Sequence, residues 1–312
     1  MNELKIVYMG TPDFSVLPLE KISDLYDVLL VVTQPDKEVG RKKEIKYSPV
    51  KEFALKRNIE VFQPNKIKEE YKKIIELKPD IIITCAYGQI IPKELLDYPK
   101  YGCINIHASL LPKYRGGSPI HKAIINGEDK TGITIMYMDE KMDSGDIIYQ
   151  EEIKIEQEDN VGTLFDKLSI LGSNMIIKIL PDIIKGNVKR KKQDENKVTY
   201  AYNITREDEK LDFNNNTIDI HNKIRGLNPW PVAYAILDEK KVKIFTSEIS
   251  NNKKDGKIGE IISINNDSIG IKTKDGEILI KELQFEGKKK VLVKDYLNGI
   301  QDKNILLGKI FK

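Results

Sequence analysis

Several features that would define particular classes of protein are scarce or missing in this chain of 312 residues. Its two cysteines, Cys85 and Cys103, do not form a CxxC pair, and with three histidines in the chain neither a disulfide framework nor a zinc site is expected. No apolar run reaches the roughly 18 residues of a membrane span, and the first residues lack the basic and apolar regions of a signal peptide. We therefore expect a cytoplasmic protein with reduced thiols.

The chain also lacks a large excess of either positive or negative residues. Lys and Arg total 51 against 48 Asp and Glu, so the formal net charge is +3. A nucleic-acid surface would therefore have to come from local clusters of basic residues. The length suits two domains, because about 100 to 200 residues is the common domain size.

The first half of the chain alternates short apolar runs with helix-like stretches. This order is typical of a doubly wound α/β domain with a mostly parallel sheet, in which ligands bind outside the carboxyl ends of the strands. The expected strands cover 4–9, 28–33, 60–62, 80–86 and 103–107, and the expected helices cover 14–22, 49–57, 67–77 and 93–96.

The pattern changes after a long amphipathic helix that is expected from residue 161 to just before Gly186. A polar segment follows, so we predict a first domain over 1–188, a linker over 189–206 and a second domain over 207–312. Closely spaced strands in the second domain, separated by turns, predict a small OB-like antiparallel β-barrel. These strands are expected at 233–237, 242–248, 257–264, 268–272 and 278–285.

The turn after the first expected strand, Gly10-Thr-Pro-Asp-Phe14, is a candidate nucleotide-binding loop. It has one glycine where the dinucleotide fingerprint has three, and Pro12 and Phe14 would crowd a pyrophosphate. A nicotinamide cofactor is therefore not expected.

Asn105 and His107 are the first candidates for chemistry. They are two positions apart at the end of an expected strand, so both side chains lie on one face while Ile104 and Ile106 lie on the other. Asp143, in a turn marked by Ser144-Gly145, could bring a carboxylate to the same pocket. For two isolated residues, a structural role in satisfying backbone groups would be the simpler interpretation.

The motifs that follow favour a catalytic role instead. Three of them together resemble the folate-dependent formyltransferase family: Ser109-Leu-Leu-Pro112, Arg115-Gly-Gly-Ser-Pro119 and Asp143-Ser-Gly-Asp146. Further marks, such as Thr33-Gln-Pro-Asp36 and Pro229-Trp-Pro231, extend the resemblance over nearly the whole chain. Departures are modest, with Ala108 where many relatives have Gly and Tyr114 where some have Trp.

The resemblance implies transfer of a formyl group from 10-formyltetrahydrofolate, as co-substrate, to the free amino group of methionine on initiator tRNA. No metal is implied, and we expect a monomer. The implied catalytic residues are Asn105, His107 and Asp143. The implied folate contacts are Ser109, Leu110, Leu111, Pro112, Tyr87, Gly88 and Ile91.

The chemistry of formyl transfer fits these residue types. The reaction passes through a tetrahedral oxyanion, which needs a hydrogen-bond donor, and it needs a group to take the amine proton. Asn105 offers an amide donor, and His107 offers a side chain of the type that titrates near neutrality. Asp143 could hold the imidazole directly or position a water that relays the proton.

A basic loop, Arg41, Lys42 and Lys43, follows the second expected strand. On composition alone such a run is most often a solvated loop, but the resemblance implies that it enters the tRNA acceptor arm. The resemblance also implies that the second domain binds tRNA, although lysines are frequent throughout the chain.

Three alternatives remain open. Another folate formyltransferase, acting on glycinamide ribonucleotide or a sugar nucleotide, would leave the second domain or the basic loop unexplained. A formyltetrahydrofolate hydrolase domain shares the two-domain plan. A non-catalytic RNA-binding protein would not need Asn105, His107 and Asp143.

Overall fold

The computed structural model describes residues 4–40, 43–250, 252 and 254–312. The chain forms two compact units, and each unit contains more than one segment of the sequence. Unit 1 comprises Met1–Pro119, Thr131–Ile153 and Phe165–Tyr202, and unit 2 comprises Ile120–Lys130, Lys154–Leu164 and Asn203–Lys312. Within the described part of the chain, no helix combines the length and the apolar character needed to cross a membrane.

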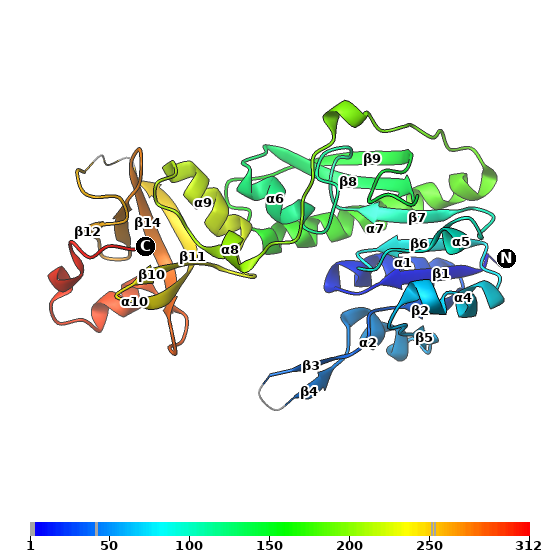
Figure 1. Ribbon diagram of the computed structural model, residues 1–312, viewed down its shortest axis with the longest axis horizontal. Coiled ribbons are helices and arrows are strands. Elements are labelled where there is room, and N and C mark those ends of the chain that lie inside the picture. The colour runs from blue at the N-terminus through cyan, green and yellow to red at the C-terminus, as the bar shows by residue number, and fades with distance from the viewer. Residues whose placement is uncertain (1–3, 41–42, 251, 253) are drawn as a thin grey trace. The chain divides into compact units, whose positions relative to one another are not determined.

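Unit 1 is built on a seven-stranded sheet with the order β5-β2-β1-β6-β7-β8-β9 (Figure 1). Strands β1, β2, β5, β6 and β7 pair in parallel, and β8 is antiparallel to β7. This confirms the doubly wound, mostly parallel sheet expected from the sequence. The strands are β1 (Ile6–Gly10), β2 (Val28–Val32), β5 (Val61–Phe62), β6 (Ile81–Cys85), β7 (Cys103–His107), β8 (Lys130–Tyr137) and β9 (Ile147–Lys154).

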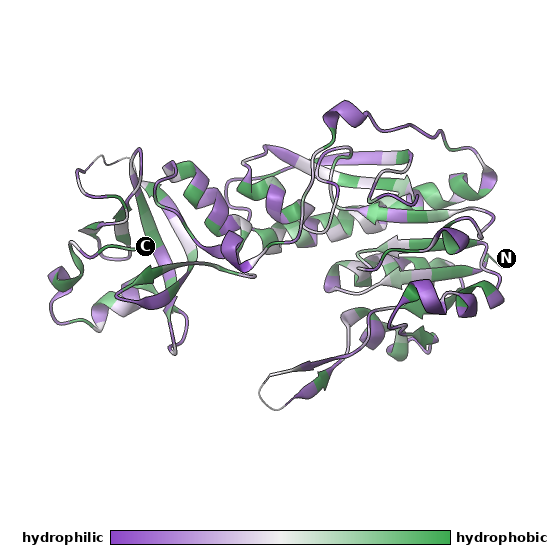
Figure 2. Cartoon of the chain, in the orientation of Figure 1, coloured by the Kyte–Doolittle hydropathy of each residue, from purple (hydrophilic) through white to green (hydrophobic). Residues whose placement is uncertain are grey.

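The central strands are continuous apolar runs because helices cover parallel sheets on both faces. All residues of β1, β6 and β7 are buried, whereas β9 at the edge has several exposed residues. Figure 2 shows the same contrast, with β1 and β6 mainly green and β9 partly purple.

Short helices connect the strands of unit 1. They are η1 (Asp13–Ser15), α1 (Val16–Leu25), α2 (Pro49–Lys56), α3 (Ile67–Glu70), α4 (Lys72–Glu76) and α5 (Lys93–Leu96). A further short helix of this unit, η2 (Glu195–Lys197), follows its last strand. Helix α2 begins as its sequence predicts, because Ser48 Oγ accepts a hydrogen bond from Lys51 N at 3.1 Å and Pro49 needs no N–H partner at the first position. Helices α6 (Pro119–Ile125) and α7 (Val161–Lys185) contain residues of both units.

A small antiparallel hairpin, β3 (Lys37–Val39) and β4 (Glu44–Lys46), extends from unit 1 between β2 and α2 (Figure 1). The sequence predicted only a basic loop here. All residues of β4 are exposed, and Lys43 Nζ lies 3.5 Å from Glu38 Oε2. Arg41 and Lys42, which were predicted to contact tRNA together with Lys43, lie outside the described residues.

Unit 2 contains an antiparallel sheet with the order β10-β11-β14-β13-β12, and β15 also pairs with β14. The expected antiparallel β domain is thereby confirmed. Its strands are β10 (Ala233–Leu237), β11 (Lys240–Ser250), β12 (Ile261–Ile264), β13 (Ile269–Lys272), β14 (Glu277–Phe285) and β15 (Val291–Leu292). Its helices are α8 (Arg206–Glu209), α9 (Thr217–Gly226), α10 (Val293–Asn298) and η3 (Lys303–Leu306).

The last residues of the chain connect the two end strands of this sheet. Ile236 in β10 exchanges two backbone hydrogen bonds with Lys312, each of 2.8 Å, and Ile261 in β12 donates to Lys309 O at 2.8 Å. Ile220 and Ile224 of α9 belong to the buried apolar cluster that also contains core residues of β11 and β14.

Candidate active site

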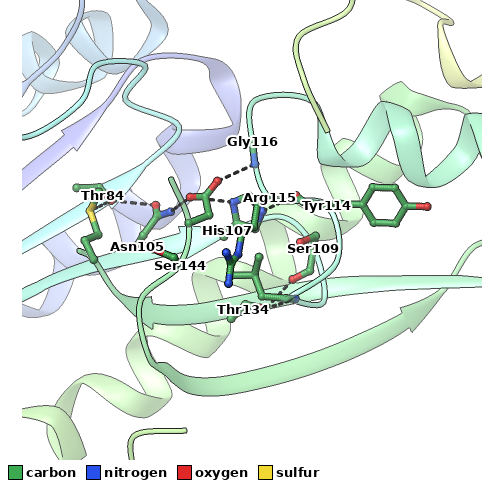
Figure 3. A network of polar contacts seen from close by, with 12 residues as sticks. Thr84, Asn105, His107, Ser109, Tyr114, Arg115, Gly116, Thr134 and Ser144 are labelled. Atoms are coloured by element: carbon green, nitrogen blue, oxygen red, sulfur yellow. Dashed lines mark hydrogen bonds and ion pairs between the residues drawn. The ribbon is translucent and has the colours of Figure 1, made fainter. Parts of the chain in front are cut away.

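The site lies where β6 and β7 end. Asn105 and His107 are 8% and 6% exposed and lie on the same face of β7, as their spacing predicts. Thr84 of β6 is the register partner of Asn105, and its hydroxyl donates to Asn105 Oδ1 at 2.9 Å. Because Oδ1 is used as an acceptor, the amide nitrogen Nδ2 is directed toward Asp143, whose Oδ1 lies 3.4 Å away (Figure 3).

His107 is fixed by the loop that follows its own strand. Its Nε2 lies 3.0 Å from the carbonyl oxygen of Tyr114, which can only accept, so Nε2 carries a proton. In the neutral imidazole, Nδ1 is then unprotonated. This Nδ1 lies 3.6 Å from Asp143 Oδ1, which is longer than a hydrogen bond.

Asp143 completes the group. Its backbone is in the left-handed region, with φ at 49°, and its Oδ2 accepts the N–H of Gly116 at 2.8 Å. Its other oxygen faces both Asn105 Nδ2 and His107 Nδ1. The structure therefore brings together the three side chains that the sequence predicts to be catalytic. After that prediction, we refer to Asn105, His107 and Asp143 as the catalytic cluster.

Two residues that the sequence reasoning missed hold the Asp143 turn. Gln193 Nε2 donates to the carbonyl oxygens of Asp143 and Gly145, at 2.8 and 2.9 Å. Arg115 Nε and Nη2 in turn donate to Gln193 Oε1, at 3.0 and 2.9 Å. Arg115 is 3% exposed and also pairs with Glu195 at 2.8 Å, and this contact lowers the pKa of the Glu195 carboxyl.

No sequence signal pointed to Gln193. It lies in the segment predicted to be a linker, 50 residues beyond Asp143, without a hydrophobic period around it. In the structure, Thr199 and Ala201 of the same segment form backbone hydrogen bonds with Arg115 at 2.9 and 2.7 Å. Arg115 itself is the first residue of the Arg115-Gly-Gly-Ser-Pro119 motif.

The Ser109 to Pro112 loop, predicted to contact folate, is anchored on β8. Thr134 Oγ1 donates to Ser109 O at 2.6 Å and accepts from Leu111 N at 3.1 Å (Figure 3). Ser109 Oγ donates to Lys113 O at 2.7 Å, and Leu111 is buried. Leu110 and Pro112 are the partly exposed members of the loop.

A cavity of about 640 Å³ lies next to the turn that carries Asp143, although Asn105, His107 and Asp143 are not among its lining residues. Its volume is in the range of small-molecule sites. Two apolar residues, Leu96 and Met138, line it together with polar and charged ones: Lys93, Asp97, Asp139, Glu140, Lys141, Ser144 and Glu195. Ser144 follows Asp143 directly, so the cavity reaches the catalytic turn.

None of the residues predicted to contact folate lines this cavity, neither Tyr87, Gly88 and Ile91 nor the Ser109 to Pro112 loop. Tyr87 and Ile91 are buried in the apolar cluster that includes Leu96, and Met138 packs against that cluster. Burial raises the pKa of Tyr87, whose hydroxyl has no hydrogen-bond partner in the described part of the chain. Gly88 has a left-handed φ of 89°.

The other two histidines belong to unit 2. Burial lowers the pKa of both His121 and His221. The ring of His121 packs edge-on against Trp230 at a centroid distance of 6.3 Å, and His221 Nδ1 lies 3.0 Å from Ser247 Oγ. Their contacts account for them as packing residues.

Two family models match this chain. The model described as formyl transferase matches residues 5–180, and the model described as formyl transferase, C-terminal domain, matches residues 203–301. Together they cover most of the sequence.

Similar proteins match over almost their full length. The methionyl-tRNA formyltransferase of Staphylococcus aureus strain bovine RF122 / ET3-1 is 49% identical over 308 residues, covering 98% of each chain. The methionyl-tRNA formyltransferase of Staphylococcus epidermidis is 51% identical over 309 residues, covering 98% of this chain and 99% of the relative.

Solved structures support the fold. An N-formyltransferase from Helicobacter canadensis, in complex with folinic acid and dTDP-3-aminofucose, superposes with a TM-score of 0.68 at 24% identity, covering 89% of this chain and 98% of its own. HypX from Aquifex aeolicus with tetrahydrofolic acid gives a TM-score of 0.65 at 18% identity, covering 96% of this chain and 48% of its own.

Proposed function

We propose, from the premise that this chain belongs to the formyl transferase family, that it transfers a formyl group from 10-formyltetrahydrofolate to the free amino group of methionyl-tRNA. The product is N-formylmethionyl-tRNA, which serves translation initiation. The observation that carries the chemistry is the convergence of the Asn105 amide and the His107 imidazole on Asp143 Oδ1, at 3.4 and 3.6 Å.

Asn105 supplies the donor for the formyl oxygen. Because Thr84 engages Oδ1, the two N–H bonds of Nδ2 remain on the side of the site. One of them points to Asp143, and within the described part of the chain no hydrogen-bond partner engages the other. A fixed amide donor stabilises the negative charge that develops on the formyl oxygen when the amine attacks.

His107 takes the proton that the attacking amine must lose, and the protonated ring can give it to N10 of the folate as the bond between N10 and the formyl carbon breaks. The bond from Nε2 to Tyr114 O leaves the Nδ1 lone pair as the acceptor in the neutral ring. Once Nδ1 is protonated, the imidazolium stands beside the carboxylate of Asp143, which stabilises it. We therefore favour direct pairing of Asp143 with the protonated ring over a relay through water.

The cavity beside Ser144 is the site we assign to the folate. Leu96 and Met138 are its two apolar lining residues, and the carboxylate of Asp139 can accept from the amino and ring N–H groups of a pterin, while Glu140 pairs with Lys93 at 3.2 Å. The Ser109 to Pro112 loop, held on Thr134, would border the folate where it approaches the catalytic cluster. We propose an indirect role for Tyr87, Gly88 and Ile91 in shaping the folate site. Tyr87 and Ile91 belong to the same buried apolar cluster as Leu96, against which Met138 packs.

For the acceptor we propose initiator methionyl-tRNA, bound by Arg41, Lys42 and Lys43 and by the C-terminal domain. We further propose a catalytic domain over 1–188, a linker over 189–206 and a tRNA-binding domain over 207–312, in a monomer that works in the cytoplasm. Near-full-length identity to relatives named methionyl-tRNA formyltransferase supports this acceptor over the nucleotide-linked sugars of other family members.

A direct assay tests the function. The purified protein is incubated with 10-formyltetrahydrofolate and charged initiator tRNA, in parallel with uncharged tRNA, charged elongator tRNA and an amino-sugar nucleotide. We expect rapid formylation of the charged initiator alone. Transfer to the sugar nucleotide, or to none of the four, would overturn the assignment.

A further inference from the structure

Two exposed tyrosines stack on each other in the segment that follows Gln193. The ring centroids of Tyr200 and Tyr202 are 5.5 Å apart, and the angle between the ring planes is 4°. Tyr200 is 49% exposed and Tyr202 is 64% exposed. The pair therefore presents aromatic surface to solvent, which is a property of binding sites rather than of packed cores.

The backbone beneath the two rings is fixed. Ala201, between them, is fully buried, its N–H donates to Arg115 O at 2.7 Å, and its carbonyl accepts from Ser118 N at 3.0 Å. Side chains alternate along an extended segment, so the burial of Ala201 places both tyrosines on the solvent side. The rings form a platform that needs little further ordering when a ligand binds.

The platform is connected to the catalytic cluster by short contacts. Gly116, the neighbour of Arg115, donates its N–H to Asp143 Oδ2 at 2.8 Å. A Cβ on Gly116 would lie 2.7 Å from Ala201 O, and the φ of Gly116 is +122°, so only glycine permits this approach. A planar group on the tyrosines is thus held close to the segment that positions Asp143.

We propose that Tyr200 and Tyr202 are the stacking site for the unpaired bases at the 3′ end of the tRNA, an inference that rests on the proposed function. The reacting amine is attached to the terminal nucleotide, so the adjoining bases must lie near the catalytic cluster during transfer. Base stacking on aromatic rings suits any base, because every base has a π face.

The charge of the same segment fits this ligand. Lys191 and Lys192 are exposed and precede the tyrosines by about ten positions. Lys197 lies between them and the pair, with a side chain that is 74% exposed and 3.5 Å from the carboxylate of Asp194. Cations beside aromatic platforms attract the phosphates of a single strand. The segment thus combines aromatic rings that can stack on bases with cations that can attract phosphates, as sites for single-stranded nucleic acid do.

Paired variants test the proposal. The double change Tyr200→Leu with Tyr202→Leu removes the aromatic faces but keeps apolar bulk, and Tyr200→Phe with Tyr202→Phe keeps the faces. Loss of stacking is expected to raise the KM for methionyl-tRNA by about tenfold or more in the Leu pair, with kcat and the KM for 10-formyltetrahydrofolate unchanged. The Phe pair should resemble the wild-type protein.

A second measurement does not depend on catalysis. tRNA carrying 2-aminopurine in place of its 3′-terminal adenine should lose fluorescence on binding to the wild-type protein and the Phe pair, but not on binding to the Leu pair. Equal quenching by all three proteins, or a raised KM for the folate instead of the tRNA, would overturn the stacking site. If the wild-type protein formylates tRNA normally in such a case, the proposed function stands and only this inference fails.

Discussion

The catalytic cluster and the β3–β4 hairpin, both in unit 1, hold their polar groups in opposite ways. Asn105 and His107 are less than a tenth exposed. Asn105 Oδ1 accepts a hydrogen bond from Thr84, and His107 Nε2 donates one to the carbonyl oxygen of Tyr114. In the hairpin, Lys43 and Glu38 lie 3.5 Å apart with side chains that are 78% and 60% exposed. Bond-making chemistry depends on fixed geometry, whereas attraction to phosphates depends mainly on charge.

The largest expected effect comes from removing a member of the catalytic cluster. Asn105→Ala should lower kcat by about 10² to 10³, and His107→Ala by about 10² to 10⁴, measured as initial rates at saturating substrates. Because these groups act as a unit, the double variant should lose little more than the worse single variant. A folded His107→Ala protein that kept more than about a tenth of wild-type turnover would contradict the role given to His107.

A smaller loss is expected when the support of the Asp143 turn is removed. Gln193→Leu deletes both hydrogen bonds to the carbonyls of Asp143 and Gly145 and leaves the buried guanidinium of Arg115 without this partner. We expect kcat to fall about tenfold with the KM for tRNA unchanged, and the free energy of unfolding to fall by about 1 to 3 kcal/mol.

The matched control for Gln193 is Glu195→Gln, followed by initial rates and thermal unfolding. The Glu195 side chain is 72% exposed, so its ion pair with Arg115 is screened by solvent, and kcat and the free energy of unfolding should stay close to those of the wild type. Glu195 also lines the cavity assigned to the folate, so the KM for folate does not belong to this control. Wild-type kcat in Gln193→Leu would show that the Asp143 turn keeps its geometry without this contact.

The hairpin should respond differently from the catalytic cluster. Arg41→Ala and Lys43→Ala should each raise the KM for tRNA by a few-fold and leave kcat nearly unchanged. The slope of log affinity against log salt should decrease by about 0.7 to 0.9 for each cation that contacts a phosphate. Lys66→Ala removes another exposed cation of unit 1, paired with Glu69 at 2.9 Å, and serves as control. An equal effect of Lys66→Ala would show that the hairpin has no special role.

The smallest effect is expected at the two thiols, Cys85 in β6 and Cys103 in β7, the strands of Thr84 and of Asn105 and His107. Burial raises the pKa of Cys85 to about 12 and also raises the pKa of Cys103. A raised pKa keeps both thiols protonated at pH 8, so a disulfide reagent should label neither in buffer and both in denaturant. Rapid labelling of the native protein would indicate that β6 and β7 open frequently. That outcome would contradict a fixed geometry of the catalytic cluster.

Sequence patterns predicted the regular parts of the fold well. The bounds of β7 at 103–107 and of β10 at 233–237 agree fully with the expected strands, because uninterrupted or alternating apolar residues define where a buried strand begins and ends. The β3–β4 hairpin was missed because β4 is fully exposed, so no apolar alternation marks it. The helix expected over 67–77 is divided at Tyr71 into α3 and α4.

The part of the candidate site that local sequence patterns encode was predictable. Spacing alone places Asn105 and His107 on one face, and the turn at Ser144-Gly145 is visible in the sequence. The contacts of Gln193 and Arg115 with the Asp143 turn join segments that lie far apart along the chain, and no local pattern encodes such contacts. The same holds for the stacking of Tyr200 on Tyr202, which depends on the backbone pairing of Ala201 with Arg115.

The interleaving of the two units limits how this protein can be recombined in evolution or in the laboratory. Besides the C-terminal segment from Asn203, unit 2 takes Ile120–Lys130 and Lys154–Leu164, which lie between segments of unit 1 in the sequence. A single crossover at residue 203 would therefore join a new C-terminal part to two segments that were selected to pack with the old one. A crossover at residue 188 would in addition separate Asp143 from Gln193. Exchange of specificity between relatives is thus expected to proceed by point changes rather than by shuffling of whole domains.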